Sequence, residues 1–367
     1  MKIERVEIYK ADLPLKRPFR IAIGETTVAN TLFVRIHVGG DVYGMGEANL
    51  FTPIVSETQA TALAAAQDIA TLLIGMNPLD IDSCVHTMCG FMPHNPTTRS
   101  AFDMALFDIL GKVARLPLYA VLGGPRRPIY TDNTVGIDTP DVMVERALEI
   151  QARDFPAVKV KVGTTATEDI ERIQRIRDAI GPDLPIRIDA NQGWNAVAAM
   201  QALHGMADLG VQYCEQPVPV WDFESMVAVH ATTRIPIMAD ESVFDEHDAL
   251  KLIRMNACDY LNIKLAKSSG IHVGLKINAV AEAAGMGCMV GCMTESRLGL
   301  TAAAHLVSSR PNILFADLDG ADMLREDPIV GGMVYREGGR IELPEEPGLG
   351  ADVDPDYLKT LERIEIC

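Results

Sequence analysis

The sequence IRIDANQGW at residues 186–194 decides the fold of this chain. It begins as a short β-prone segment, but this segment ends on Asp189, where an apolar residue would be ordinary. Taken alone, an acidic residue in that position is most often a helix cap or a turn residue. The same arrangement recurs several times along the chain, however, and this repetition indicates a barrel of parallel strands.

Short β-rich apolar segments alternate with helical segments beyond residue 128. The predicted strands are 129–136, 157–162, 185–189, 211–215, 236–240, 260–264, 287–293 and 312–317. Eight evenly spaced strands with seven helices between them predict a closed parallel β/α barrel. An open, doubly wound sheet is disfavoured because no GxGxxG sequence follows the first strand.

Residues 1–125 have a different pattern, which predicts a small α+β domain. The expected elements are strands at 3–15, 31–40 and 42–48 and helices at 56–74 and 97–114, with Ser56 as the N-cap of the first helix. The sequence LGGPRRP at 122–128 is typical of a domain boundary. We therefore expect the barrel to span residues 126–320 and the tail, 321–367, to return to the first domain.

Composition restricts the classes of partner and location. The net charge of −17 argues against binding to nucleic acid or to an anionic membrane surface and favours a small molecule or a metal ion. The longest apolar runs are too short to span a membrane, and charged residues interrupt the start, so no signal peptide is expected. Seven cysteines without a CxxC pair indicate reduced thiols in a cytoplasmic protein.

Charged residues end five consecutive predicted strands of the barrel. They lie 24 to 28 residues apart, one β/α unit each time, at Lys161, Asp189, Glu215, Asp240 and Lys264. This spacing places them at the same height, on the C-terminal rim where the active sites of β/α barrels are found.

The three acidic residues of this series, Asp189, Glu215 and Asp240, predict a metal site. Three carboxylates that point into one barrel mouth would repel one another unless a cation lay among them. Ligands that are all oxygen favour a hard ion, Mg²⁺ first, Mn²⁺ second and both well before Zn²⁺.

The two lysines of the series predict proton transfer. Lys161 is on the second strand and Lys264 on the sixth, so in a closed eight-stranded barrel they face each other across the mouth. One lysine could remove the proton next to a substrate carboxylate while the other returns a proton to the opposite side. Lys159, on the same strand face as Lys161, would supply a cation that lowers the pKa of the base.

Five motifs in this order resemble the enolase superfamily, and specifically its muconate-lactonizing subgroup. They are KVKVG (159–163), IDANQGW (188–194), CEQP (214–217), MADES (238–242) and NIKLAKSSGI (262–271). The resemblance implies a modified (β/α)7β barrel under an N-terminal capping domain. It also implies Mg²⁺ on Asp189, Glu215 and Asp240, acid–base roles for Lys161 and Lys264 with support from Lys159, and subunit contacts through the capping domain, as in a homo-oligomer.

The eighth predicted strand gives information about the substrate. ADLDG (316–320) places Asp317 and Asp319 on one face, opposite the metal site. With its carboxylate on the metal, a dipeptide would hold its ammonium group about 7 Å away, within reach of these aspartates. This DxD sequence resembles the mark of dipeptide epimerases such as L-Ala-D/L-Glu epimerases, in which it holds the substrate's α-amino group.

The segment 15–30 would close over the substrate, by the same resemblance. Gly24 and Glu25 stand where members selective for a C-terminal Glu carry an Arg, so the preferred side chain is not strictly Glu. Phe19 would contribute to an apolar lid, whereas Glu25 could instead receive a cationic side chain. Asn191 and Met293 are further candidates for substrate contact. Arg297 could contact substrate or form a surface ion pair.

The sequence thus predicts an isomerase, a Mg²⁺-dependent dipeptide epimerase that inverts the α-carbon of the C-terminal residue. An N-succinylamino acid racemase or o-succinylbenzoate synthase would use the same metal and lysines and is the alternative. A metal-binding or scaffolding protein without catalytic activity is disfavoured because all five charged rim positions are present. Acylated amino acids would leave Asp317 and Asp319 unpaired, which favours the dipeptide.

Overall fold

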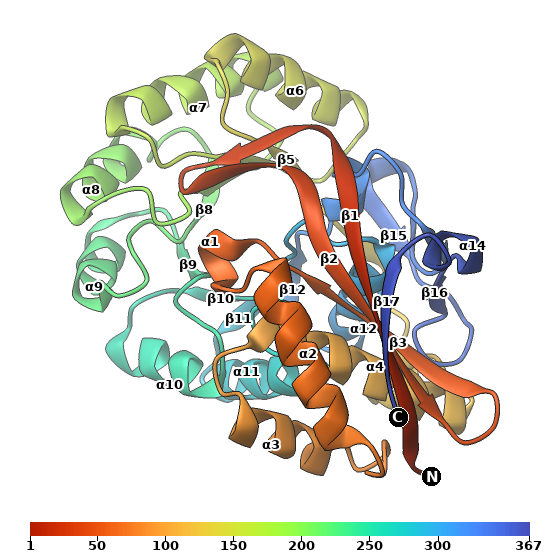
Figure 1. Ribbon diagram of the computed structural model, residues 1–367. Helices are drawn as coiled ribbons and strands as arrows, with labels where there is room; N and C mark the ends of the chain where they lie inside the picture. Colours follow the sequence, from red (N-terminus) through yellow and green to blue (C-terminus); the bar gives the residue numbers. More distant parts are fainter.

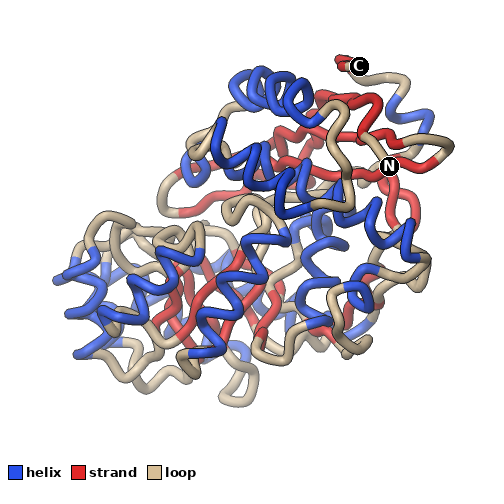
Figure 2. Tube along the Cα trace, turned by 90° about the horizontal axis from the view of Figure 1, so that it is seen from below, coloured by secondary structure: helices blue, strands red, loops and turns tan.

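The computed structural model describes all 367 residues of the chain. A ring of strands surrounded by helices forms one part, and an antiparallel sheet with helices packed on it forms the other (Figure 1). The second part lies against one end of the ring (Figure 2). One continuous hydrophobic core includes residues of both parts.

The ring is the predicted parallel barrel. Its strands are β5 (Asn133–Val135), β6 (Val158–Lys161), β7 (Ile186–Asp189), β8 (Val211–Glu215), β9 (Ile237–Ala239), β10 (Tyr260–Ile263), β11 (Gly287–Val290) and β12 (Ile313–Ala316), in sequential order. The seven helices between them are α6 (Pro140–Ala152), α7 (Ala166–Ile180), α8 (Ala196–Gly205), α9 (Phe223–Thr232), α10 (Glu246–Met255), α11 (Ile271–Ala283) and α12 (Arg297–Ser309). A parallel bridge between Thr131, just before β5, and Ala316 of β12 closes the ring, which confirms the predicted modified barrel.

The first predicted barrel strand, 129–136, is wrong as a single element. Its first residues form β4 (Ile129–Tyr130), which pairs with β15 (Arg340–Glu342) of the tail, and only β5 joins the barrel. The interruption falls at Asp132, whose carboxylate is buried and accepts a hydrogen bond from Arg187 on β7. The ion pair thus lies where the chain passes from β4 to β5.

The capping sheet has the strand order β17-β1-β2-β3. Its strands are β1 (Ile3–Ile21), β2 (Gly24–Val38), β3 (Val42–Asn49) and β17 (Glu362–Ile366), and its helices are α1 (Thr52–Val55), α2 (Gln59–Leu73), α3 (Ile81–Phe91), α4 (Pro96–Ala114) and α5 (Leu118–Val121). The segment 15–30, expected as a closing loop, is the far end of the β1–β2 hairpin. This end reaches over the barrel toward β5 (Figure 1).

The predicted N-cap of the helix at 56–74 is also wrong. Ser56 has φ +59° and closes the short helix α1 instead. Thr58 caps α2, since its hydroxyl accepts a hydrogen bond from the backbone of Thr61. Two capping residues in close succession are hard to rank from sequence because both hydroxyls suit the role.

Helix α4 packs directly on β3 through two glycines. A Cβ atom on Gly46 would lie 1.8 Å from the carbonyl oxygen of Ala101, and one on Gly44 would lie 2.0 Å from that of Ala105. We expect Gly46→Ala to lower the free energy of unfolding by about 3 kcal/mol, since the sheet and helix must separate. Urea denaturation measures this, and Gly90→Ala, at an exposed helical site with no atom within 4 Å, is the control that should cost nothing.

The tail beyond the barrel contacts both parts of the molecule. Its elements are α13 (Gly320–Met323), β13 (Ile329–Gly331), β14 (Val334–Tyr335), the 3₁₀ turn Glu337–Gly339, β15, β16 (Ala351–Val353), α14 (Pro355–Leu358) and β17. β17 pairs with β1, whereas β15 pairs with β4 beside the barrel. We propose a division into a capping domain of residues 1–125 that the tail, 321–367, completes and a barrel of residues 126–320.

Two further features concern location and redox state. None of the helices combines the length and the apolar character that a membrane crossing requires. All seven cysteines are free thiols, and five of them are buried.

Candidate active site

The carboxyl ends of the barrel strands carry the charged residues that the sequence singles out. Lys161, Asp189 and Glu215 are neighbours in the strand register, Lys161 opposite Asp189 and Asp189 opposite Glu215. Asp240 and Lys264 directly follow β9 and β10. The structure therefore brings all five residues to one end of the barrel, under the capping domain.

Asp189, Glu215 and Asp240 form a compact acidic cluster. One carboxylate oxygen from each lies within 4.8 Å of the other two, and all three side chains are fully buried. One oxygen in this cluster, Asp240 Oδ1, accepts no hydrogen bond and lies 3.5 Å from Lys267 Nζ. Buried carboxylate oxygens without hydrogen-bond donors are costly unless a cation binds them, so these residues fit a hard divalent ion.

The two lysines lie on opposite sides of this cluster. Lys161 Nζ donates to Asp189 Oδ2 at 2.5 Å, and Lys264 Nζ donates to Asp240 Oδ2 at 2.7 Å. Burial alone would lower the pKa of Lys264, but the charges of Asp240 and Glu215 together raise it above its usual range. Each lysine is thus held by a different carboxylate, with the acidic cluster between the two amines.

Lys159 lies in the barrel interior, two residues before Lys161 on β6. Its ammonium group donates to Asp317 Oδ2 at 2.5 Å and lies 2.8 Å from Glu215 Oε2 and 3.6 Å from Asp189 Oδ2. Burial opposes its positive charge, but these carboxylates, Asp317 first, raise the pKa of Lys159 well above its usual range. A fully buried ammonium with three anionic neighbours stays charged, so Lys159 balances the acidic cluster rather than transferring protons.

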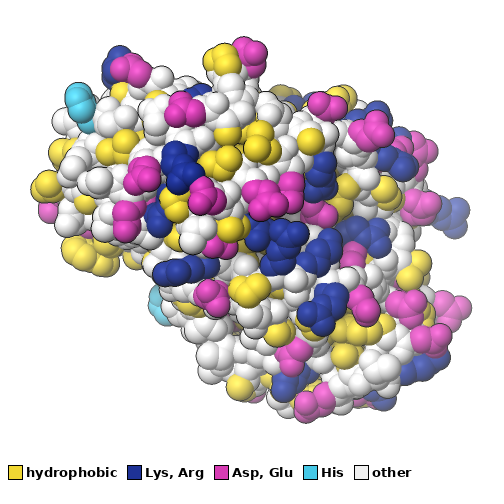
Figure 3. Space-filling model, turned by 90° about the horizontal axis from the view of Figure 1, so that it is seen from above, with side chains coloured by type: hydrophobic (Ala, Val, Ile, Leu, Met, Phe, Trp, Pro, Cys, Tyr) yellow, Lys and Arg dark blue, Asp and Glu magenta, His cyan; other side chains and the backbone are white.

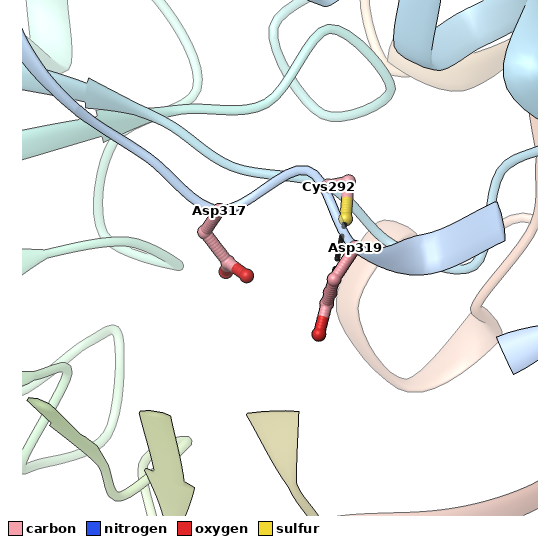
Figure 4. A group of neighbouring side chains, drawn as sticks. All are labelled: Cys292, Asp317 and Asp319. Carbon is pink, nitrogen blue, oxygen red and sulfur yellow. Dashed lines mark hydrogen bonds between the residues drawn. The ribbon is translucent and has the colours of Figure 1, made fainter. Parts of the chain in front are cut away.

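Asp317 and Asp319 follow β12 and point into the same space (Figure 4). Their carboxylates and the Cys292 thiol form a second close group, in which the thiol contacts Asp319 at 3.9 Å. Lys159 neutralises Asp317 and holds its pKa low in spite of burial. Burial and the charge of Asp317 raise the pKa of Asp319 to about 7. Asp319 is therefore the carboxylate of the pair that still lacks a cationic partner.

A cavity lined by both lysines and both aspartates joins the two groups. Its lining residues are Phe19, Ile21, Thr26, Phe51, Ile54, Thr134, Lys161, Asn191, Lys264, Cys292, Met293, Thr294, Asp317, Asp319 and Met323. The predicted substrate contacts Phe19, Asn191 and Met293 are therefore present, whereas Gly24 and Glu25 do not line the cavity. Gly24 faces Phe51, which lines it, and Glu25 is exposed to solvent on β2.

The sequence IRIDANQGW builds one wall of this site through local contacts. Asp189 accepts a hydrogen bond from the backbone of Asn191 at 2.9 Å, which directs its other oxygen toward Lys161. Gly193 packs on the loop that follows β6. A Cβ atom on Gly193 would lie 2.1 Å from the carbonyl oxygen of Gly163 in that loop. Trp194 is buried and donates its indole N–H to Asp169. The turn after Asp189 is thus held on both sides.

Some residues at the site carried no signal in the sequence. Asn262 donates to Glu215 Oε1 at 2.7 Å and so orients this carboxylate, and Thr134 donates its backbone N–H to Asp319 at 2.7 Å. Asn262 begins the quoted motif NIKLAKSSGI, but a strand Asn or Thr has no distinctive spacing that would assign either residue this orienting role. Arg297 lies outside the cavity and pairs with Asp327.

The fold and the site together define a capped β/α barrel with paired lysines and a carboxylate cluster at its mouth. Residues 3–123 match the N-terminal domain of the mandelate racemase and muconate lactonizing enzyme family, and residues 142–357 match the enolase C-terminal domain-like family. The chain belongs to this family, the enolase superfamily group of muconate-lactonizing type.

Similar proteins in this family have assigned activities. A D-Ala-D/L-Ala epimerase of Cytophaga hutchinsonii is 44% identical over 99% of both chains, and a hydrophobic dipeptide epimerase of Enterococcus faecalis is 40% identical over 95% of this chain and 99% of its own. A crystal structure of the Cytophaga hutchinsonii dipeptide epimerase, complexed with Mg and the dipeptide D-Ala-L-Val, has a TM-score of 0.99 at 43% identity and covers all of both chains.

Proposed function

We propose that this chain is an isomerase, a Mg²⁺-dependent dipeptide epimerase that inverts the α-carbon of the C-terminal residue. The observation that carries this proposal is the position of Lys161 and Lys264 on opposite sides of three clustered carboxylates, in a cavity that ends at Asp319. The names of the similar proteins, two dipeptide epimerases at 40% identity or more, support the same activity.

Asp189, Glu215 and Asp240 are the proposed ligands of the ion. When bound, Mg²⁺ supplies positive charge that neutralises these carboxylates and stabilises the negative charge that develops on a substrate carboxylate. Mn²⁺, a slightly larger ion with similar ligand preferences, is the expected substitute.

Lys161 and Lys264 are the proposed acid–base pair. A neutral amine on one side takes the α-proton with its lone pair, and the electrons of the broken C–H bond move into the substrate carboxylate. The ammonium on the other side then donates a proton to the α-carbon, and these electrons return to form the new C–H bond. The net change is inversion of one carbon and one proton moved between the two lysines. In the reverse direction the lysines exchange roles.

Asp319 is the proposed partner of the substrate's ammonium group. We expect Asp319→Asn to lower kcat/KM for a free dipeptide about 100-fold, because it leaves a buried ammonium without its counterion. An N-acylated amino acid carries no ammonium, so its turnover should be unaffected. Exchange of the α-proton in D₂O, followed by mass spectrometry, measures both substrates. Asp356→Asn, at an exposed aspartate on α14, is the matched control.

The same comparison tests the alternative, an N-succinylamino acid racemase or o-succinylbenzoate synthase. If the wild-type protein exchanges only the N-succinyl substrate, Asp317 and Asp319 bind something other than an ammonium and the alternative replaces the proposal. The dipeptide is favoured because an acylated substrate would leave the buried carboxylate of Asp319 without a cation.

The side chain of the C-terminal residue is proposed to be apolar. Phe19, Ile21, Phe51, Ile54 and Met293 belong to the apolar part of the cavity lining. No Arg or Lys lies among the lining residues apart from the two rim lysines, so an acidic side chain would find no further cation there.

Location and assembly remain separate proposals. Free thiols at all seven cysteines support a cytoplasmic location. Assembly into a homo-oligomer through the capping domain is the expectation from the family, and light scattering of the purified protein tests it.

A further inference from the structure

A second cleft lies beside the cavity and shares part of its wall. Phe19, Thr134, Asp319 and Met323 line both spaces. The cleft runs between the far end of the β1–β2 hairpin and the region of β5 and α6, where the capping part meets the barrel. Lys and Arg side chains gather along this junction (Figure 3).

Several cations in the cleft have no anionic partner. Its basic lining residues are Lys16, Arg17, Arg20, Arg146 and Arg153. Lys16 and Arg153 both pair with Asp322, at 3.6 Å and 3.1 Å. The side chains of Arg17, Arg20 and Arg146 form no ion pair or hydrogen bond, a contrast with the net charge of −17 for the whole chain.

A backbone contact holds Arg20 beside the substrate cavity. Ile137 donates its backbone N–H to the carbonyl oxygen of Arg20 at 2.9 Å, which joins the hairpin to the end of β5. Earlier on the same segment, Thr134 of β5 donates its backbone N–H to Asp319. Arg146 is half-buried on α6 across the cleft. The cationic cleft therefore begins at the carboxylate proposed to bind the ammonium group.

We propose that this cleft is a subsite for an acidic side chain on the N-terminal residue of the substrate, so that the substrates include L-Glu-L-Xaa and L-Asp-L-Xaa dipeptides with an apolar Xaa. This inference rests on the proposed epimerase function. A dipeptide ammonium at Asp319 places the side chain of the same residue next to the cleft. A carboxylate there would meet guanidinium groups, which bind carboxylates through two parallel hydrogen bonds.

Other anions fit this cleft less well. An extended polyanion would meet Asp138 and Glu149, which also line it, and the acidic surface of the rest of the chain. An N-succinyl group carries a carboxylate of similar reach but no ammonium, and it would leave Asp319 unpaired. A zwitterionic N-terminal residue with an acidic side chain satisfies the carboxylate and the arginines together.

The test compares two isosteric substrates, L-Glu-L-Leu and L-Gln-L-Leu, through kcat/KM for α-proton exchange in D₂O with Mg²⁺. We expect the wild-type protein to favour L-Glu-L-Leu about tenfold at low ionic strength, and this ratio to fall as salt is added. In the double variant Arg20→Gln with Arg146→Gln we expect a ratio of about one. Arg254→Gln, at an exposed arginine on α10, removes the same type of charge far from the cleft and should keep the ratio.

The outcomes separate this inference from the function on which it rests. Exchange of both dipeptides with a wild-type ratio near one, or a ratio that the double variant retains, overturns the acidic subsite and leaves the epimerase proposal standing. Absence of exchange with every dipeptide overturns the epimerase proposal itself. Exchange of N-succinyl-L-leucine in place of L-Glu-L-Leu assigns the arginines to an acyl carboxylate and also overturns the inference.

Discussion

Replacement of Lys264 or Lys161 with alanine is expected to lower epimerisation by about 10³-fold or more, since each lysine serves one side of the α-carbon. The two amines lie on either side of the acidic cluster, each in contact with a different carboxylate of it. Neither lysine can therefore reach the side that the other serves. Loss of one lysine removes the base in one direction of the reaction and the acid in the other, so neither direction can proceed.

The same geometry predicts an asymmetric result for proton exchange. Each single variant retains one lysine, which still exchanges the α-proton on its own side with solvent. We expect Lys161→Ala to incorporate deuterium from only one epimer of the dipeptide and Lys264→Ala from only the other. Mass spectrometry on each pure epimer in D₂O measures this. Epimerisation that persists in both variants would contradict the scheme.

Two controls separate proton transfer from a structural role. Lys276→Ala removes an exposed lysine from α11 and should leave epimerisation intact. Lys264→Arg keeps a positive charge beside Asp240 but stays protonated, since a guanidinium does not lose its proton in proteins. We therefore expect Lys264→Arg to regain any stability that the alanine variant loses while it remains inactive.

The barrel and its rim could be predicted from the sequence because their signal repeats. Asp189, Glu215 and Asp240 each end a short apolar strand, and a spacing of one β/α unit leaves few arrangements for them. The register then confirms the shared height of Lys161, Asp189 and Glu215. Periodic patterns of this kind are the most reliable part of a sequence interpretation.

The parts that failed depend on contacts between distant segments. Residues 129–136 look like one strand, but β4 pairs with a tail segment more than 200 residues later. No local sequence pattern predicts this pairing. Glu25 was predicted to contact the substrate, but it faces solvent on β2 and does not line the cavity. Each outcome is set by tertiary packing rather than by local preference.

Replacement of Glu215 with glutamine is expected to abolish Mg²⁺ binding and, with it, the activity. The exchange is isosteric, but it removes one of three charges from the acidic cluster and places an amide N–H₂ group beside the remaining two carboxylates. Titration calorimetry with Mg²⁺ alone measures the binding directly. A metal-dependent rise in the thermal midpoint gives a second reading, because 100-fold excess over Kd stabilises the wild-type fold by about 2.7 kcal/mol. This rise should vanish in Glu215→Gln.

The control for this variant is Glu47→Gln, which removes another buried carboxylate that does not belong to the cluster. Glu47 accepts hydrogen bonds from the backbone at Ser296 and Gly299, and burial raises its pKa to about 8. Glu47→Gln should lower the thermal midpoint, because an amide cannot accept all these hydrogen bonds. The variant should still show the rise in the thermal midpoint on addition of Mg²⁺. If Glu215→Gln still binds Mg²⁺ with wild-type affinity, the ion is held elsewhere and the role of the three carboxylates must be assigned again.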